Sequence, residues 1–168
     1  MNKHEIILEN GNKMKVAISL NQDGSIYLGN PWTAPSFVVY EIKQDQNIVK
    51  YKKIHQKENP WLSQDESVIC DPMMCEDGCS DIIKEDLNHL ADHYIILEVI
   101  NGCTALLSNL FCSNLEKVLT NGGIDIYPYP VFIKDPDIAI NSFIVSNFTP
   151  KETFNGENLK IIKLDFKQ

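Results

Sequence analysis

The first third of the chain shows the short apolar runs and two-residue alternation that are typical of β-strands. Residues 14–20 form an apolar run that ends at the turn signal Asn21-Gln-Asp-Gly24. Residues 36–43 are rich in β-branched and aromatic side chains, and residues 25–28 between these two runs can return as a short strand. Residues 47–55 carry lysines on both faces, which predicts a half-exposed edge strand. These patterns predict a sheet built from the beginning of the chain.

The middle of the chain changes to helical spacing. No period is sustained over residues 56–79, which predicts a long loop, and apolar positions at helical spacing then predict a helix over residues 81–91. Residues 94–100 are almost all apolar, as expected of a strand covered on both faces. The pair Asn101-Gly102 is expected to turn into a second helix, which Asn121-Gly122-Gly123 ends. Its apolar face comprises Leu107, Leu110, Phe111, Leu115 and Val118.

The last third predicts three further elements. Residues 124–127 form the next strand, residues 135–146 a short terminal helix, and residues 159–166 an alternating strand that residues 5–8 can pair with. Strands that come first and then alternate with helices indicate an α/β domain, with a mixed sheet and helices on its faces in three layers.

Composition and charge exclude several classes of protein. A chain of 168 residues with 43% apolar residues is long enough for one folded domain. The net charge is -8 and every basic residue is a lysine, which argues against binding to nucleic acid or to an anionic membrane surface. No apolar run approaches the length of a membrane span, and Glu5 and Glu9 interrupt any secretory signal. We therefore expect a cytoplasmic protein.

Charge is unevenly distributed along the chain. Residues 63–92 hold nine carboxylates against Lys84 alone, whereas residues 43–57 hold five lysines against Asp45 alone. This segregation predicts a dipolar surface. Solvated faces explain it most simply, and an acidic face that docks a lysine-rich partner, or a homodimer formed through the lysine-rich strand, are the alternatives.

The cysteines carry the strongest chemical signal. Cys70, Cys75 and Cys79 lie within ten residues of the predicted loop, and three soft thiolates suit an iron–sulfur cluster, zinc or copper(I). Cys103 is expected at the carboxyl end of a strand and the amino end of a helix, where a thiolate is favoured, and so is a candidate fourth ligand. Cys112 is interpreted as a packing residue inside the second helix, and His93 as a surface or capping residue.

Several runs together resemble the dinitrogenase iron-molybdenum cofactor biosynthesis family, the NifX-like domain. Residues 14–19, Met-Lys-Val-Ala-Ile-Ser, are similar to its opening strand, and residues 36–42, Ser-Phe-Val-Val-Tyr-Glu-Ile, to its third strand. Residues 90–103, Leu-Ala-Asp-His-Tyr-Ile-Ile-Leu-Glu-Val-Ile-Asn-Gly-Cys, resemble its helix end, buried strand and glycine turn. The resemblance covers residues 14–145 and leaves 1–13 and 146–168 as extensions, with a strand expected in each that can pair with the other.

This resemblance implies a ribonuclease H-like three-layer α/β fold without nuclease chemistry, and a carrier that holds or inserts an iron–sulfur or iron–molybdenum type cluster. It implies cofactor contacts from Gly29 and Asn30 in the loop after the second strand, and from Gly102 and Cys103 in the glycine turn. That loop reads Tyr27-Leu-Gly-Asn-Pro-Trp-Thr-Ala34, where the family commonly carries His-Phe-Gly-Arg-Ala, so the family's histidine and arginine are missing.

The sequence therefore predicts a non-catalytic metal-cluster carrier that uses Cys70, Cys75, Cys79 and Cys103, with zinc as the alternative metal. Its expected partners are cofactor-assembly or cluster-acceptor proteins. Two alternatives stay open: a thiol-redox protein in which Cys103 is the nucleophile and a loop cysteine resolves it, and an acidic protein-interaction module.

Overall fold

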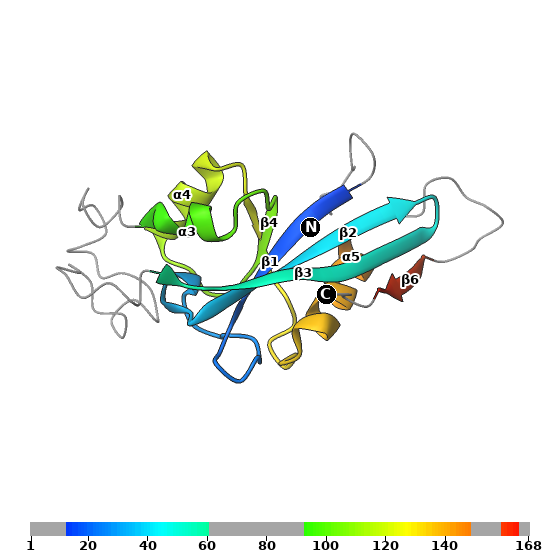
Figure 1. Ribbon diagram of the computed structural model, residues 1–168, viewed down its shortest axis with the longest axis horizontal. Helices are drawn as coiled ribbons and strands as arrows, with labels where there is room; N and C mark the ends of the chain where they lie inside the picture. The colour runs from blue at the N-terminus through cyan, green and yellow to red at the C-terminus, as the bar shows by residue number, and fades with distance from the viewer. Residues whose placement is uncertain (1–12, 61–92, 149–158, 165–168) are drawn as a thin grey trace.

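The computed structural model describes residues 13–60, 93–148 and 159–164, and one mixed sheet runs through all three segments (Figure 1). The strand order is β5-β4-β1-β2-β3-β6. The strands are β1 (Lys13–Leu20), β2 (Ser36–Asp45), β3 (Ile48–Glu58), β4 (Ala105–Leu107), β5 (Asp125–Tyr127) and β6 (Lys160–Lys163). The helical elements are the 3-10 turn η1 (Pro31–Thr33), α3 (Ile95–Val99), α4 (Ser113–Asn121) and α5 (Pro136–Asn147).

Strands β1, β2 and β3 form an antiparallel meander, and β4 and β5 extend the sheet parallel to β1. The predicted strands at residues 14–20, 36–43, 47–55 and 124–127 are thereby confirmed. The predicted strand over residues 25–28 is wrong, because only Ile26 forms a bridge, to Leu20. The structure also corrects the edge position of β3: its first four residues pair with β6, so only its second half is an edge among the described residues.

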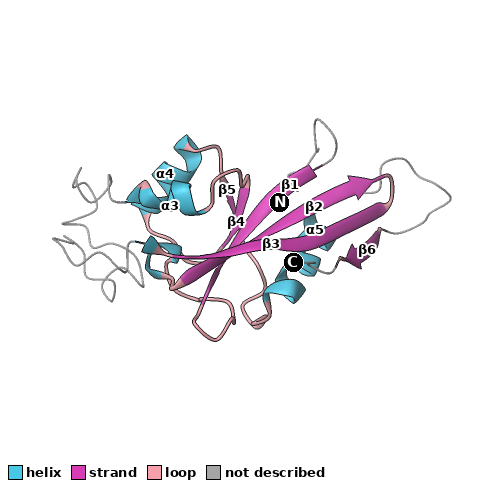
Figure 2. Ribbon diagram, in the orientation of Figure 1, coloured by secondary structure: helices cyan, strands magenta, loops and turns pink. Residues whose placement is uncertain are grey.

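Helices cover both faces of the sheet, and the alternation of β1 explains the two cores (Figure 2). Val16 and Ile18 point to a face where α5 packs, whereas Ala17 points to the opposite face, where α3 and α4 pack. All three residues are fully buried. The alternate residues of a strand point to opposite faces, so one run of apolar residues can line two cores. The predicted mixed α/β sheet with helices on its faces is confirmed at this level.

The segment 94–100 is a helix and not the predicted buried strand. Helix α3 buries Ile96, Val99 and the following Ile100, while Glu98 points to solvent. This is spacing by three and four residues, which a short, nearly all-apolar run conceals. The strand that reaches the sheet comes later, at Ala105–Leu107, where Ala105 pairs with Val16.

This shift also moves the start of the following helix. Leu107 belongs to β4, and α4 begins only at Ser113, with Cys112 as its N-cap rather than a residue inside the helix. Its end at Asn121 agrees with the prediction, and Gly123 adopts a φ of 74° that favours glycine. The terminal helix is confirmed as α5, whose N-cap Asp135 accepts a hydrogen bond from the Asp137 amide at 2.8 Å.

The C-terminal strand is confirmed over β6. The predicted loop over residues 56–79 begins too early, because β3 continues to Glu58. Its part beyond residue 60, the predicted helix over residues 81–91 and the predicted strand over residues 5–8 lie outside the described residues.

Candidate functional site

The carboxyl ends of the parallel strands β1, β4 and β5 lie side by side at one end of the sheet. We call this end of the sheet, as distinct from its edge strands, the carboxyl edge. Ile18 pairs with Leu107 and Leu107 with Tyr127, so the loops that follow these strands emerge side by side. Open α/β sheets bind ligands at this edge, where the loops after the strands supply the contacts. The described loops here span residues 21–35, 108–112 and 128–135.

A buried turn fills the loop after β1. Pro31 is the first residue of η1 and fixes its own φ for the turn, and the amide of Thr33 donates to the carbonyl of Asn30 at 2.9 Å. Trp32 is fully buried and stacks on the ring of His93, with 4.2 Å between ring centroids and 16° between planes. The Asn59 amide donates to the Trp32 carbonyl at 2.9 Å, so the end of β3 is held against the same turn.

A thiol and an imidazole meet beside this turn. The Cys112 sulfur lies 3.3 Å from Nε2 of His93, and both residues are buried, with His93 fully inaccessible. As the N-cap of α4, the Cys112 sulfur also accepts from the Leu115 amide at 3.4 Å. The interpretation of His93 as a surface residue is therefore wrong, because its ring is enclosed between Trp32 and Cys112.

The predicted loop cysteines Cys70, Cys75 and Cys79 lie outside the described residues. The chain enters that segment at Pro60 and leaves it at His93. Both ends of the segment are held at the carboxyl edge, because Asn59 bonds to Trp32 and His93 stacks on it.

Buried polar groups without described partners also gather near this edge. Both polar atoms of the Asn30 side chain, which is fully buried, have no hydrogen-bond partner within the described ranges. The same is true of the Ser19 hydroxyl, and of the Ser113 hydroxyl and the Asn114 amide nitrogen in the first turn of α4. Buried polar groups in folded proteins are usually paired with a protein group or with ordered water, so these atoms mark positions where water or another polar group can bind.

The structure separates the two halves of the predicted cofactor site. Gly29 and Asn30 lie at the carboxyl edge, whereas Gly102 and Cys103 precede β4 and lie at the opposite edge, where the Thr104 amide bonds to the carbonyl of Lys15. The cause is the shift of the strand from 94–100 to 105–107, which places Cys103 before a strand instead of after one.

The electrostatics of Cys103 also differ from the prediction. Burial raises the pKa of its thiol to about 11, although Lys15 and Lys57 act in the opposite direction. The thiol therefore stays protonated near neutral pH, and the expectation of a thiolate at this position is wrong.

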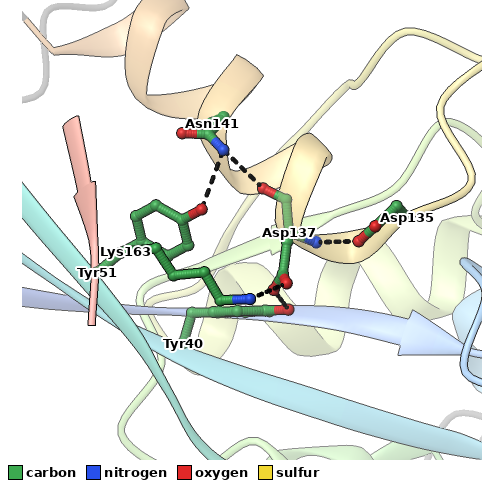
Figure 3. A network of polar contacts seen from close by, with 6 residues as sticks. All are labelled: Tyr40, Tyr51, Asp135, Asp137, Asn141 and Lys163. Carbon is green, nitrogen blue, oxygen red and sulfur yellow. Dashed lines mark hydrogen bonds and ion pairs between the residues drawn. The ribbon is translucent and has the colours of Figure 1, made fainter. Parts of the chain in front are cut away.

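A second polar cluster fixes α5 to the opposite face of the sheet (Figure 3). Asp137 accepts a hydrogen bond from the Tyr40 hydroxyl at 2.6 Å and forms an ion pair with Lys163. The Asn141 amide donates to the Tyr51 hydroxyl at 3.0 Å. Burial, followed by the bond to Asp137, raises the pKa of Tyr40. Because each of these groups has a partner and the cluster joins α5 to β2, β3 and β6, it is a structural network.

The pairing of Cys112 with His93 is not among the contacts predicted from the sequence. A signal was present, since Ser113-Asn114 interrupts the apolar run after Phe111 and is typical of a helix start. That signal places Cys112 next to the start of a helix, but the contact with His93 depends on how α3 packs and is not encoded in residue spacing.

No protein-family model matches this chain, and no curated protein matches it significantly. Within residues 13–60, 93–148 and 159–164, no three metal-ligating side chains form a group that could hold a metal ion by themselves. None of the helices in these ranges is long and apolar enough to cross a membrane.

Proposed function

We propose that the protein binds a metal ion or an iron–sulfur type cluster through thiolates at the carboxyl edge, and carries it to an acceptor protein without catalysing a reaction. The observation that carries this proposal is the buried contact of 3.3 Å between the Cys112 sulfur and Nε2 of His93. A thiol and an imidazole are the two ligand types that zinc and iron–sulfur sites combine.

The distance fits two ligands of one metal. A thiolate sulfur at about 2.3 Å and an imidazole nitrogen at about 2.0 Å from a tetrahedral metal lie roughly 3.5 Å apart. The contact in the protein differs from this by only a few tenths of an ångström. Burial of both side chains would shield bound metal from solvent. Cys112 therefore replaces Cys103 in the proposed ligand set.

The remaining two ligands of a four-ligand site are proposed to be Cys75 and one of Cys70 and Cys79. Cys70 follows Pro60 by ten residues, and Cys79 precedes His93 by fourteen. Ten residues can span up to about 33 Å, so chain length allows each cysteine to reach the carboxyl edge. The unpartnered side chain of Asn30 supports a bound group at this edge, in the loop where the family resemblance implies a cofactor contact.

The strand order supports the resemblance that underlies the carrier role. The described sheet is mixed, with β1, β2 and β3 antiparallel and with β4 and β5 added in parallel, in the order β5-β4-β1-β2-β3-β6. A mixed sheet with helices on both faces is compatible with the three-layer fold that the resemblance implies. The stretch compared with the family's buried strand needs a new register, with residues 105–107 as the strand in place of residues 94–100.

The proposal is tested by purifying the protein anaerobically from iron-replete cells and measuring metal, sulfide and the absorption spectrum for the wild type and Cys75→Ser. We expect iron and sulfide in the wild type, with a broad thiolate-to-iron band near about 400 nm that is lost in the variant. Bound zinc without sulfide would assign the same ligands to the alternative metal. A metal-free wild-type protein that also fails reconstitution with iron and sulfide would contradict the proposal.

A further inference from the structure

The face of the sheet that carries α3 and α4 ends in a grid of charged side chains at the start of β1. Lys13, Lys43 and Lys50 are directly opposite one another across β1, β2 and β3. Two residues along each strand, Lys15, Glu41 and Lys52 form a parallel row. We call these six residues the lysine face. It combines five positive charges with one negative charge in a chain whose net charge is -8.

This arrangement is electrostatically costly. Like charges directly opposite on neighbouring strands destabilise a sheet, and Lys43 has a lysine on each side. Glu41 offsets part of the cost: its carboxylate lies 3.0 Å from Lys13, 3.4 Å from Lys43 and 3.8 Å from Lys52.

The carboxylate of Glu41 is only 8% exposed, whereas the three lysines are 40–53% exposed. Burial alone would raise the pKa of Glu41, but hydrogen bonds and attraction from Lys13 and Lys43 hold it below its usual value. The lysine face thus already holds one carboxylate in its charged form. Lys15 and Lys50 have no ion-pair partner within the described ranges.

The lysine face lies beyond the described helices on its side of the sheet. The apolar core beneath α3 and α4 reaches Ala17 and Val39, which lie two residues along their strands from Lys15 and Glu41. Figure 1 shows the β2–β3 hairpin continuing past α3 and α4, while α5 packs on the other face. A hollow of about 250 Å3 opens among the charged residues, lined by Glu41, Lys43, Lys50, Tyr51, Lys52 and Leu164.

We infer that the lysine face binds an acidic segment of a partner protein in an extended conformation. Charge complementarity indicates that the partner carries carboxylates, because the carboxylate of Glu41 already lies among these lysines. The spacing between the two rows indicates that the bound segment is extended. The two rows are two residues apart along the strands, or about 6.6 Å, which is also the spacing of alternate side chains in an extended peptide. Carboxylates at alternate positions can therefore meet successive rows.

The same observations disfavour nucleic acid. The lysine face spans three strands, or about 10 Å, so it can neutralise only a few charges of a long polyanion. The chain also contains no arginine, the side chain that pairs with phosphate in bidentate geometry.

The test uses a fluorescent peptide of alternating Glu and Ser with four glutamates, and measures binding to the full chain by fluorescence anisotropy at about 50 mM salt. We expect saturable binding that weakens steeply as salt is raised. The double substitution Lys15→Gln, Lys50→Gln should weaken binding by about three- to thirtyfold, since the half-buried Lys15 and the exposed Lys50 each lose a charge pair with the peptide. It leaves the three ion pairs of Glu41 in place.

The matched control is Lys53→Gln, which changes the residue next to Lys52 but on the opposite face of β3, where Lys53 donates to Gln56 at 3.1 Å. Its affinity should equal that of the wild type.

Three results would overturn the inference: no binding of the alternating peptide at millimolar concentration, equal affinity of the double variant and the wild type, or tighter binding of an oligonucleotide of equal charge. Self-association of the free wild-type protein that the double variant abolishes would assign the lysine face to a second copy instead of a partner. Circular dichroism of each variant separates loss of binding from loss of folding.

Discussion

The network between α5 and the sheet allows a quantitative prediction about Tyr40→Phe. This change removes only the hydroxyl that donates to Asp137 at 2.6 Å, and keeps the ring, which is 1% exposed. A hydrogen bond to a charged group contributes about 1.5–3 kcal/mol. Because the Asp137 side chain is 32% exposed and keeps its ion pair with Lys163, we expect the lower end, a loss of about 1.5 kcal/mol in the free energy of unfolding.

The matched control is Tyr51→Phe. It removes a neutral hydrogen bond from Asn141 of the same helix and again leaves the ring in place. A neutral bond contributes about 0.5–1.5 kcal/mol, so this variant should lose less stability than Tyr40→Phe. Urea unfolding followed by circular dichroism at pH 7 measures both values under the same conditions.

The pH dependence distinguishes a charge-assisted bond from simple packing. Burial alone would raise the pKa of Asp137, but the bonds from Lys163 and Tyr40 hold it below its usual value. The stability from this group is therefore present above the unfolded pKa of about 3.9, and is lost as the pH falls through the lower folded value. The deficit of Tyr40→Phe should shrink in that acidic range. A loss equal to that of Tyr51→Phe, unchanged by pH, would refute the reasoning.

Three further predictions concern other parts of the fold. Glu41→Gln should lower the free energy of unfolding by about 1–2 kcal/mol at low salt, because its three ion pairs are lost and the lysines repel each other. Urea unfolding at low and high salt should show that this loss shrinks as salt screens the charges. An equal loss at both salt concentrations would contradict the prediction. The thiol of Cys103 has a pKa of about 11, so it should be alkylated about a hundredfold more slowly at pH 7 than an exposed cysteine. Site-resolved mass spectrometry measures both rates, and equal rates would contradict the burial of Cys103. Gly102→Ala should lower stability by about 1 kcal/mol in urea unfolding, since Gly102 has a φ of 83°, and an unchanged midpoint would refute this.

The early strands and the terminal helix could be predicted because their signals are local. Residues 14–20 and 36–43 combine apolar runs with turn residues, and the terminal helix has Asp135 as a cap and Pro136 as its first residue. The secondary structure predicted for residues 94–107 was wrong for a physical reason. A seven-residue run that is almost entirely apolar shows no clear period, so helix and buried strand have the same pattern.

That single error displaced the predicted site. A strand at residues 94–100 implies that Cys103 lies at the carboxyl edge and that Cys112 lies inside the following helix. The structure reverses these positions, because the turn before β4 holds Cys103 and the N-cap of α4 holds Cys112. Contact between Cys112 and His93 depends on the packing of α3 against α4 and η1, which spacing along the chain does not determine.

The proposed metal site lies at the carboxyl edge, with Cys112 and not Cys103 among its proposed ligands. The most direct test is the metal content per chain of three proteins purified anaerobically in parallel: the wild type, Cys112→Ser and Cys103→Ser. We expect Cys112→Ser to lose most of the bound metal and Cys103→Ser to keep the wild-type amount, with circular dichroism showing that both are folded. Full metal content in Cys112→Ser together with its loss in Cys103→Ser would contradict the proposed ligand set.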